Sequence, residues 1–388
     1  MTTKSINSLQ IGMHWFPERA GGLDRVYHAL VGALPAAGVA VRGVVAGSPG
    51  VAEESGGAIR AVAPATQSLP LRLMAMRRAL RREIGRQVPD VISSHFALYT
   101  YPGLDLTRGI PQVSHFQGPW ADESYGADVA SLGWRAKRYL EMAVYARSSR
   151  FVVLSDAFGR ILTERYGIKP DRIRVVPGCV NVEQFNVPLT QTEARTKLQM
   201  PQDRPIVLAV RRLVGRMGLE DLIDAMKLLK ARGSDALLAI AGKGHLEAEL
   251  RARIDTADLQ SHARLLGFVP DELLATWYRA ATVSVVPTVE LEGFGLITAE
   301  SLAAGTPVLV TPVGGLPEAV GGLSPDLVLP DTGAAAIADG IDAALRGTLR
   351  LPDANVCRAY ACANFDIAVI ARRVAAVYHE AIAEGDLP

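Results

Sequence analysis

Short apolar runs alternate with amphipathic stretches along almost the whole chain. In the first half these runs are Leu9–Met13, Val39–Val45, Val91–Ser94, Gln112–His115, Phe151–Leu154 and Ile173–Val176, and in the second half they are Ile206–Val210, Ala236–Ile240, Arg264–Leu266, Val283–Val286 and Pro307–Val310. The stretches between them follow helical patterns. Strands this apolar, separated by helices, are typical of parallel sheets covered on both faces. The pattern therefore predicts an α/β architecture of doubly wound sheets.

A lapse in this pattern divides the chain. Its 388 residues exceed what one core ordinarily serves, so two domains are expected. Strand and helix signals stop within Gln184–Asp203, where Pro188 and Pro201 occur. We place an N-terminal domain at 1–187 and a C-terminal domain at 188–366. Ligands of parallel sheets bind beyond the carboxyl ends of the strands, so the cleft between the two domains is the expected site.

Composition excludes several classes of function. Lys and Arg total 41 against 40 Asp and Glu, which leaves no charge excess to drive binding to nucleic acid. The three cysteines lack a metal-ligand spacing such as C-x-x-C; their odd number and the absence of a signal peptide indicate a reducing cytoplasm. No uninterrupted apolar run reaches the roughly 18 residues of a membrane span. We expect a cytoplasmic protein without a bound metal.

The most informative stretch carries two carboxylates, Glu292 and Glu300, around the turn Gly293–Gly295. This turn follows the strand Val283–Val286 and leads into a helix. A glycine turn at a helix start offers free backbone N–H groups and the positive end of a dipole, which favours a phosphate. Glu300 lies too far into the helix to cap it, and is better placed to accept hydrogen bonds from ligand hydroxyls. Phosphate donors beside hydroxyl acceptors suggest a nucleotide sugar.

Arginines follow the strand Ile206–Val210, at Arg211, Arg212 and Arg216. Guanidinium groups at a strand end suit a diphosphate because they stay charged and can bind two oxygens at once. A solvated basic loop is the alternative. We favour the diphosphate because two domains are expected and a phosphate-type loop is expected opposite the arginines.

The first domain carries weaker signals. Gly21 and Gly22 open a helix after the first strand, so the backbone there can approach a phosphate or an acceptor, although a simple tight turn explains them equally well. His115 ends an apolar strand and precedes the loop Gly118–Trp120; such a histidine can bind a sugar hydroxyl or stabilise developing charge. His95 has a similar position, and a structural histidine is the usual role for either. The loop that follows His115 makes it the better candidate.

The stretch 69–86 interleaves arginines with leucines and methionines. A basic amphipathic helix of this kind can lie on an anionic membrane. The commoner alternative is a sheet-covering helix with a solvated basic face. The stretch keeps peripheral membrane contact and a lipid-linked acceptor open.

Taken in order, these motifs resemble glycosyltransferase family 4. The matching pieces are Gly21-Gly22, His115, Arg212, Gly242-x-Gly244, Leu266–Val269, Glu292–Gly295 with Glu300, and Ala304–Val308. The family consists of retaining, nucleotide-sugar-dependent enzymes of the GT-B fold, in which two Rossmann-like domains face each other across a cleft. The resemblance covers nearly the whole chain.

The resemblance implies a role for each matching residue. Arg212 would contact the donor diphosphate and Glu300 the ribose hydroxyls. His115 would face the transferred sugar from the first domain. Glu292 would hold that sugar and the distal phosphate together with the turn that follows it, and the remaining donor-side residues would be Gly22, Arg216, Gly242, Val269, Gly293, Phe294, Gly295 and Leu296. A C-terminal helix at about 367–388 would pack back on the first domain, and no metal or other cofactor would be needed.

Two positions around Arg212 depart from the family pattern. The family has Gly before the diphosphate arginine and Lys five residues after it, whereas this chain has Arg211 and Met217. Losing an ammonium beside a diphosphate weakens stabilisation of the leaving group. Arg216 can take its place.

We therefore expect a retaining hexosyltransferase. Its donor would be a UDP-hexose or GDP-mannose, and its acceptor a hydroxyl of a glycan, a lipid-linked intermediate or a small molecule. Two alternatives stay open: a nucleotide-sugar 2-epimerase on the same fold, and a nucleotide-sugar binder whose chemistry has decayed, for which Met217 is the motivating residue.

Overall fold

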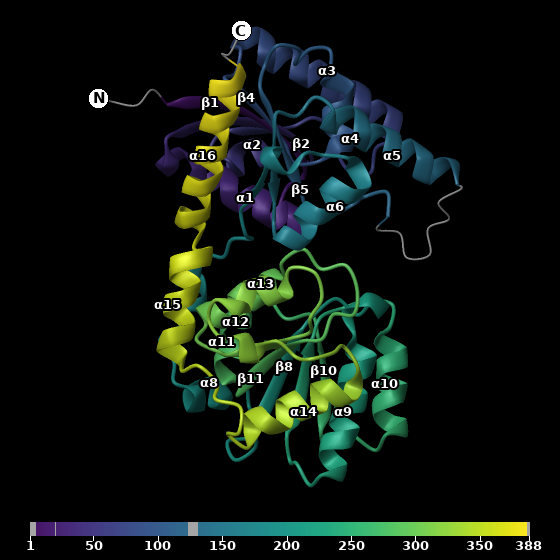
Figure 1. Ribbon diagram of the computed structural model, residues 1–388, viewed down its shortest axis with the longest axis vertical. Coiled ribbons are helices and arrows are strands. Elements are labelled where there is room, and N and C mark those ends of the chain that lie inside the picture. Colours follow the sequence, from purple (N-terminus) through teal and green to yellow (C-terminus); the bar gives the residue numbers. More distant parts are fainter. Residues whose placement is uncertain (1–4, 20, 123–130, 386–388) are drawn as a thin grey trace. The chain divides into compact units, whose positions relative to one another are not determined.

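The computed structural model describes residues 5–19, 21–122 and 131–385, which form two compact units (Figure 1). Unit 1 runs to Pro177 and resumes at Ile367, and unit 2 is Gly178–Asp366. None of the helices in these described ranges combines the length and hydropathy that a bilayer span requires.

Unit 1 is built on a seven-stranded parallel sheet in the order β3-β2-β1-β4-β5-β6-β7. Its strands are β1 Ile6–His14, β2 Val39–Ala46, β3 Ile59–Ala61, β4 Val91–Ser94, β5 Gln112–Phe116, β6 Arg150–Val153 and β7 Ile173–Val175. Its helices are α1 Gly22–Ala33, η1 Leu34–Ala37, α2 Val51–Glu54, α3 Leu69–Arg86, α4 Ala97–Thr100, η2 Tyr101–Gly103, α5 Leu132–Tyr145, α6 Asp156–Tyr166, η3 Pro170–Arg172 and α16 Ile367–Gly385.

Unit 2 is built on a five-stranded parallel sheet in the order β10-β9-β8-β11-β12. Its strands are β8 Ile206–Val210, β9 Leu237–Ala241, β10 Ala263–Gly267, β11 Val283–Val286 and β12 Val308–Val310. Its helices are α7 Val182–Phe185, α8 Gln191–Lys197, η4 Gly215–Met217, α9 Leu219–Ala231, α10 Glu247–Thr256, α11 Asp271–Ala280, α12 Leu296–Ala303, α13 Leu316–Gly321, η5 Pro325–Leu327, α14 Ala334–Leu345 and α15 Ala354–Phe365.

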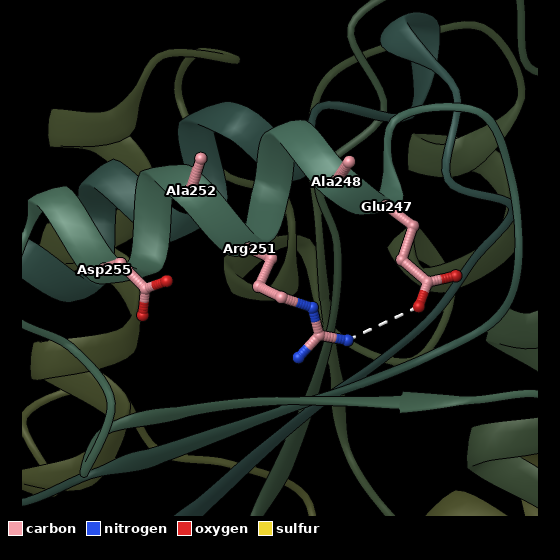
Figure 2. A pocket seen from close by; sticks show the side chains of 5 residues that line it. All are labelled: Glu247, Ala248, Arg251, Ala252 and Asp255. Atoms are coloured by element: carbon pink, nitrogen blue, oxygen red, sulfur yellow. Dashed lines mark hydrogen bonds and ion pairs between the residues drawn. The ribbon is translucent and has the colours of Figure 1, made fainter.

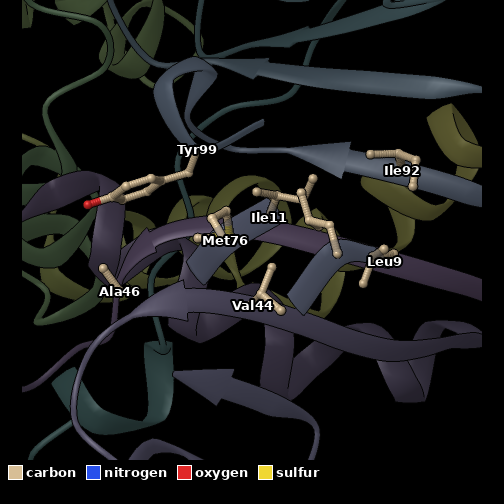
Figure 3. Packing of buried hydrophobic residues seen from close by; sticks show 8 residues of the cluster. Leu9, Ile11, Val44, Ala46, Met76, Ile92 and Tyr99 are labelled. Atoms are coloured by element: carbon tan, nitrogen blue, oxygen red, sulfur yellow. The ribbon is translucent and has the colours of Figure 1, made fainter. Parts of the chain in front are cut away.

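The sheet of unit 1 is buried on both faces, as the apolar runs predict. On one face, residues of β1, β2 and β4 meet Met76 of α3 and Tyr99 of α4 (Figure 3). On the other face, Trp15, Tyr27 and Val45 form a second cluster. Neighbouring residues on a strand point to opposite faces, so β2 supplies apolar side chains to both clusters. The expected doubly wound α/β architecture is confirmed.

The division between the units lies earlier in the chain than the expected boundary between 187 and 188. Residues from Gly178 onward belong to unit 2. The Val180 N–H donates a hydrogen bond of 2.9 Å to the Phe365 carbonyl, and α7 packs on α12 and α15. The segment has no strand or strong helical signal, so its tertiary contacts decide where it belongs.

The helix α16 belongs to unit 1, where it packs on α1, η1 and the strands β4, β5 and β6. Tyr378 is its fully buried anchor, and the Tyr378 hydroxyl donates a hydrogen bond of 2.7 Å to the Ser93 hydroxyl. Residues 386–388, at the end of the expected helix, lie outside the described residues.

Candidate functional site

Loops that follow neighbouring strands of unit 2 meet at the carboxyl edge of its sheet. The Arg211 N–H donates to the Ala241 carbonyl at 2.8 Å, and the Leu213 N–H donates to the Lys243 carbonyl at 3.0 Å. Gly242 lies directly against the Arg211 carbonyl. The loops after β8 and β9 are therefore joined through their backbones.

Two glycines allow the next pair of loops to approach. Gly218 has φ +69°, and a Cβ on it would lie 1.8 Å from the Pro287 carbonyl oxygen. Gly314 has φ +56°, and a Cβ on it would lie 1.9 Å from the Glu292 carbonyl oxygen. The Gly315 N–H donates to that same oxygen at 2.9 Å. These contacts hold together the loops after β8, β11 and β12. The loop after β8, which carries Arg211, Arg212 and Arg216 and is called the arginine loop below, therefore lies beside Glu292.

Glu292 forms an ion pair that the sequence did not indicate. Its Oε2 accepts a hydrogen bond of 2.6 Å from Nη2 of Arg211, which also donates to the Thr288 hydroxyl. Burial opposes ionisation of Glu292, but the Arg211 guanidinium outweighs it and lowers the pKa of the carboxyl; Arg216 and the Gly295 N–H act in the same direction. Glu292 is thus held as an oriented carboxylate.

The arginine loop presents two further cations. Arg212 is exposed at the end of β8. The Arg216 guanidinium donates to the Leu291 carbonyl at 2.6 Å, and the Val289 N–H donates to the Arg216 carbonyl at 3.1 Å. Met217 is buried, with 3% of its surface exposed. Arg216 therefore contacts the Glu292 loop directly, whereas the side chain at position 217 belongs to the interior.

The N-terminus of α12 begins at Gly295, which has φ +73° and no side-chain cap. The first N–H groups of a helix have no partner within the helix, so they are available to an anion. Phe294 is buried edge-on against Phe365, with ring centroids 5.0 Å apart, and Leu296 lies against Gly178. The side chains of Phe294 and Leu296 thus serve packing, and their backbone is what a ligand can reach.

Glu300 is buried within the same helix. Its Oε2 accepts a hydrogen bond of 3.0 Å from the hydroxyl of Tyr278 on α11. Sequence reasoning missed Tyr278 because an aromatic residue on an amphipathic helix has the pattern of an ordinary core residue. Thr298, in the first turn of α12, has a buried hydroxyl without a hydrogen-bond partner in the described part of the chain.

An exposed aromatic ring marks the end of β10. Val269, predicted to border the base, follows Phe268, whose side chain is 63% exposed. The Lys243 ammonium lies 5.6 Å from the centroid of the Phe268 ring. An exposed ring of this kind offers a stacking face for a planar ligand. Gly293 is buried in the turn between Glu292 and α12.

His115 does not have the environment expected of a histidine that contacts a sugar. Its ring stacks on His95 with centroids 4.0 Å apart, and its Nε2 lies 3.3 Å from the Tyr378 hydroxyl. Burial lowers the pKa of His115 to about 3. All five residues of β5 are buried, because helices cover both faces of the sheet. His115 is therefore a buried histidine beneath α16, and its role toward the transferred sugar stays a prediction.

Gly22 lies at the N-terminus of α1, as expected. The first turn of this helix already contains a carboxylate, because Asp24 is buried there and accepts a hydrogen bond of 3.1 Å from the His14 N–H. An aspartate in the first turn satisfies part of the dipole that would attract an anion. This end of unit 1 is a weaker phosphate site than the start of α12.

A shallow depression lies along α10, lined by Glu247, Ala248, Arg251, Ala252 and Asp255 (Figure 2). Arg251 donates a hydrogen bond of 3.4 Å to Glu247 one turn away. The lining comes from one helix face and includes none of the strand-end residues, so we do not place the site there. In the described ranges, no three His, Cys, Asp or Glu side chains gather in a way that could hold a metal ion.

Comparison with protein families assigns both halves of the chain. Residues 20–184 match the family model described as Glycosyltransferase Family 4, and residues 190–362 match that described as Glycosyl transferases group 1.

Curated relatives agree with this assignment. D-inositol 3-phosphate glycosyltransferase of Frankia alni is 33% identical over 327 residues, which are 78% of this chain and 77% of the relative. The enzyme of the same name from Acidothermus cellulolyticus is 34% identical over 306 residues, which are 72% of this chain. The matched stretches span 66%, 60% and 59% of the first three relatives' own lengths.

Solved structures share the fold over the whole length. Sucrose-phosphate synthase of Thermosynechococcus elongatus has a TM-score of 0.79 at 24% identity, covering 98% of this chain and 100% of that one. Anabaena Alr3699/HepE in complex with UDP-glucose has a TM-score of 0.75 at 17% identity, covering 97% and 100%. The expected GT-B fold, with two Rossmann-like domains, is confirmed.

Proposed function

We propose that this chain, which belongs to glycosyltransferase family 4, transfers a hexose from a nucleotide-diphosphate sugar to a hydroxyl of an acceptor, with retention at the anomeric carbon. The observation that carries the proposal is the edge of the unit 2 sheet. There the arginine loop, the carboxylate of Glu292 and the uncapped start of α12 are joined by direct contacts. Cations and N–H groups suit a diphosphate, and carboxylates suit sugar hydroxyls.

The donor would extend along this edge. Its base would lie near Phe268 and Val269, its ribose at Glu300 and its diphosphate between Arg212, Arg216 and the first turn of α12. The solved relative Alr3699/HepE has been crystallised with UDP and with UDP-glucose, which supports UDP-hexose as the first donor to test, with GDP-mannose beside it.

The chemistry would depend on stabilising the leaving group. A nucleoside diphosphate departs with negative charge developing on its distal oxygens, and fixed donors aimed at that charge are usually the largest catalytic contribution. Arg212, Arg216 and the α12 N–H groups would supply it without a metal ion. The anomeric carbon becomes oxocarbenium-like, and the acceptor attacks on the face that the diphosphate leaves, so a phosphate oxygen can take the acceptor proton. Glu292 would then position the sugar rather than attack it.

The acceptor is a small molecule, a glycan or a lipid-linked intermediate. The relatives named D-inositol 3-phosphate glycosyltransferase support a small phosphorylated polyol as the first acceptor to test. A lipid-linked acceptor would use the outer face of α3, where Leu71 and Met74 are 46% and 48% exposed beside the exposed arginines Arg78, Arg81 and Arg82. Such a face can lie on an anionic membrane.

A donor screen tests the proposal. The purified protein is incubated with UDP-glucose, UDP-GlcNAc or GDP-mannose, with and without inositol phosphate, and products are identified by mass spectrometry and NMR. We expect nucleoside diphosphate release that the right acceptor accelerates, and an Arg212→Ala variant whose kcat is more than about tenfold lower, roughly 1.4 kcal/mol of barrier. An epimerised donor without transfer would indicate the 2-epimerase instead. No turnover of any donor would leave only a binding function.

A further inference from the structure

A buried arginine stands where the family pattern has a glycine. The side chain of Arg211 is 7% exposed at the end of β8. Arginine is almost never buried without a partner, and here the partner is Glu292. A buried ion pair often adds no net stability to a protein. We therefore look for a functional reason for this pair at the end of β8.

The guanidinium of Arg211 is only partly satisfied. Its Nη2 donates to Glu292 and to the Thr288 hydroxyl, but its Nε is buried without a hydrogen-bond partner in the described part of the chain. Buried donors are rarely left unpaired in folded proteins. The Arg211 Nε–H, next to an oriented carboxylate, is therefore a hydrogen-bond donor that the described part of the protein leaves unused.

A second unpaired group lies beside the same carboxylate. From the point where a Cβ on Gly295 would stand, the Thr298 hydroxyl is 3.2 Å away and the Glu292 carboxyl carbon is 3.9 Å away. The Thr298 hydroxyl also has no partner among the residues that the structure describes. The Thr298 hydroxyl and the Glu292 carboxylate thus both lie next to Gly295 at the start of α12, and the Arg211 Nε and the Thr298 hydroxyl leave hydrogen-bonding capacity unused in the described part of the chain.

We infer that Arg211 is a positioning residue for the transferred sugar: it fixes the Glu292 carboxylate, which also accepts a hydrogen bond from the Gly295 N–H, in an orientation that can accept a sugar hydroxyl, and it offers its own Nε–H to the same sugar. The inference rests on the proposed function and deepens it, because it names the residue that orients Glu292 toward the sugar. Arg212 and Arg216 would serve the diphosphate, and Arg211 would serve the hexose.

The charge on Glu292 gives the inference a second consequence. Burial alone would raise the pKa of this carboxyl, and the Arg211 guanidinium reverses the shift. Charged groups on this loop and on the elements packed around it include Arg212, Arg216, Lys243, Glu290, Glu300 and Glu318. Among these Arg216 acts on Glu292 in the same direction as Arg211 but is the smaller influence. Without Arg211, Glu292 would take up a proton at a higher pH and lose its ability to accept two hydrogen bonds.

Calorimetric titration with UDP-glucose and with UDP separates the sugar from the nucleotide. For Arg211→Gly we expect affinity for UDP-glucose to fall about tenfold, as expected for loss of a charge-assisted hydrogen bond, and affinity for UDP to stay within about twofold. Arg211→Lys keeps a positive charge at this position but lacks the planar guanidinium with its several N–H donors. We expect it to recover part of the lost affinity for UDP-glucose. The control Arg253→Gln breaks a different ion pair of unit 2, with Asp224 at 2.6 Å, and should change neither affinity.

These titrations separate the proposed function from the role of Arg211. If the wild type binds neither compound, the proposed function fails. If the wild type binds both and Arg211→Gly weakens them equally, or weakens neither, the role of Arg211 is overturned. A carbon-13 NMR titration of Glu292 needs no ligand: we expect its pKa to rise in Arg211→Gly and to return toward the wild-type value in Arg211→Lys, and an unchanged pKa would also overturn the inference.

Discussion

The hydroxyl of Tyr278 on α11 donates a hydrogen bond of 3.0 Å to the Glu300 carboxylate on α12. Both side chains are buried, with 1% and 6% of their surfaces exposed. A carboxylate held at one oxygen by a rigid phenol keeps its other oxygen in a fixed direction. Tyr278 therefore prepares Glu300 for the ribose hydroxyls that the proposed function assigns to it.

Replacing Tyr278 with Phe removes this hydrogen bond and keeps the ring. We expect the KM for the donor to rise about fivefold, corresponding to roughly 1 kcal/mol, with kcat nearly unchanged, because the contact acts on binding rather than on the leaving group. Steady-state kinetics with varied donor measure both constants. Tyr360→Phe, on α15, is the control and should leave them at wild-type values. A Tyr278→Phe enzyme with reduced kcat and unchanged KM would argue against this role.

Two glycines of the loop after β8, Gly215 and Gly218, should differ in how much an alanine substitution destabilises the protein. Gly218→Ala places a Cβ against the Pro287 carbonyl at a positive φ, so the loops after β8 and β11 must separate. We expect a loss of about 2 kcal/mol or more in the free energy of unfolding, together with weaker donor binding. Gly215→Ala, where a Cβ would meet nothing within 4 Å, is the matched control. Equal stabilities of the two variants, measured by urea unfolding, would show that the contact is not needed.

His115 should matter for stability and not for turnover. His115→Ala removes a buried ring from its stack on His95 and from Tyr378, and we expect the variant to unfold about 2 kcal/mol more easily, with kcat/KM within about twofold of wild type. Its folded-state pKa of about 3 lies below the ordinary 6.5. Between these two pH values the unfolded chain binds more protons at this histidine than the folded protein does. The free energy of unfolding of the wild type therefore decreases as the pH falls through this window. The variant should therefore lose less stability than wild type on acidification. A large fall in kcat at unchanged melting temperature would instead support the catalytic role.

Glu141 predicts the opposite dependence on pH. It accepts hydrogen bonds of 2.9 Å from the Trp120 N–H and the Tyr166 hydroxyl, yet burial raises its pKa to about 7. The folded state then binds more protons than the unfolded state between 4.5 and about 7, so stability falls as the pH rises through that window. For the wild type, this fall in the free energy of unfolding amounts to up to about 3 kcal/mol. We expect the fall to be absent in Glu141→Gln. Urea unfolding at pH 5 and pH 8 measures it, and parallel curves for wild type and variant would refute the assignment.

The strands were predictable because their physical cause is local. Each of the expected apolar runs is a strand, and β3 was missed because it is short and contains Arg60. Glu292, Glu300 and the turn between them were also recognisable, since a carboxylate, a glycine turn and a helix start form one continuous stretch of sequence.

The remaining features depend on contacts between distant segments. The pairing of Arg211 with Glu292 and that of Tyr278 with Glu300 join different strand-end loops or helices, and neither pairing leaves a mark in the sequence spacing. The burial of His115 was not predictable, because periodicity gives no direction to a strand that is buried on both faces. The segment after Gly178 belongs to unit 2 through tertiary contacts and carries no strand or strong helical pattern. For this reason the boundary between the units lies earlier in the chain than expected from the sequence.

Calorimetric titration with UDP in the presence of excess EDTA measures whether the protein holds a nucleoside diphosphate without a metal ion. The account predicts saturable binding to the wild type without any divalent ion, and binding at least about tenfold weaker for Arg212→Ala, because a guanidinium that grips a diphosphate contributes a charge-assisted hydrogen bond. Arg251→Ala, an exposed arginine of α10, should bind as the wild type does. Binding that requires a metal ion, or that is identical in wild type and Arg212→Ala, would contradict the account.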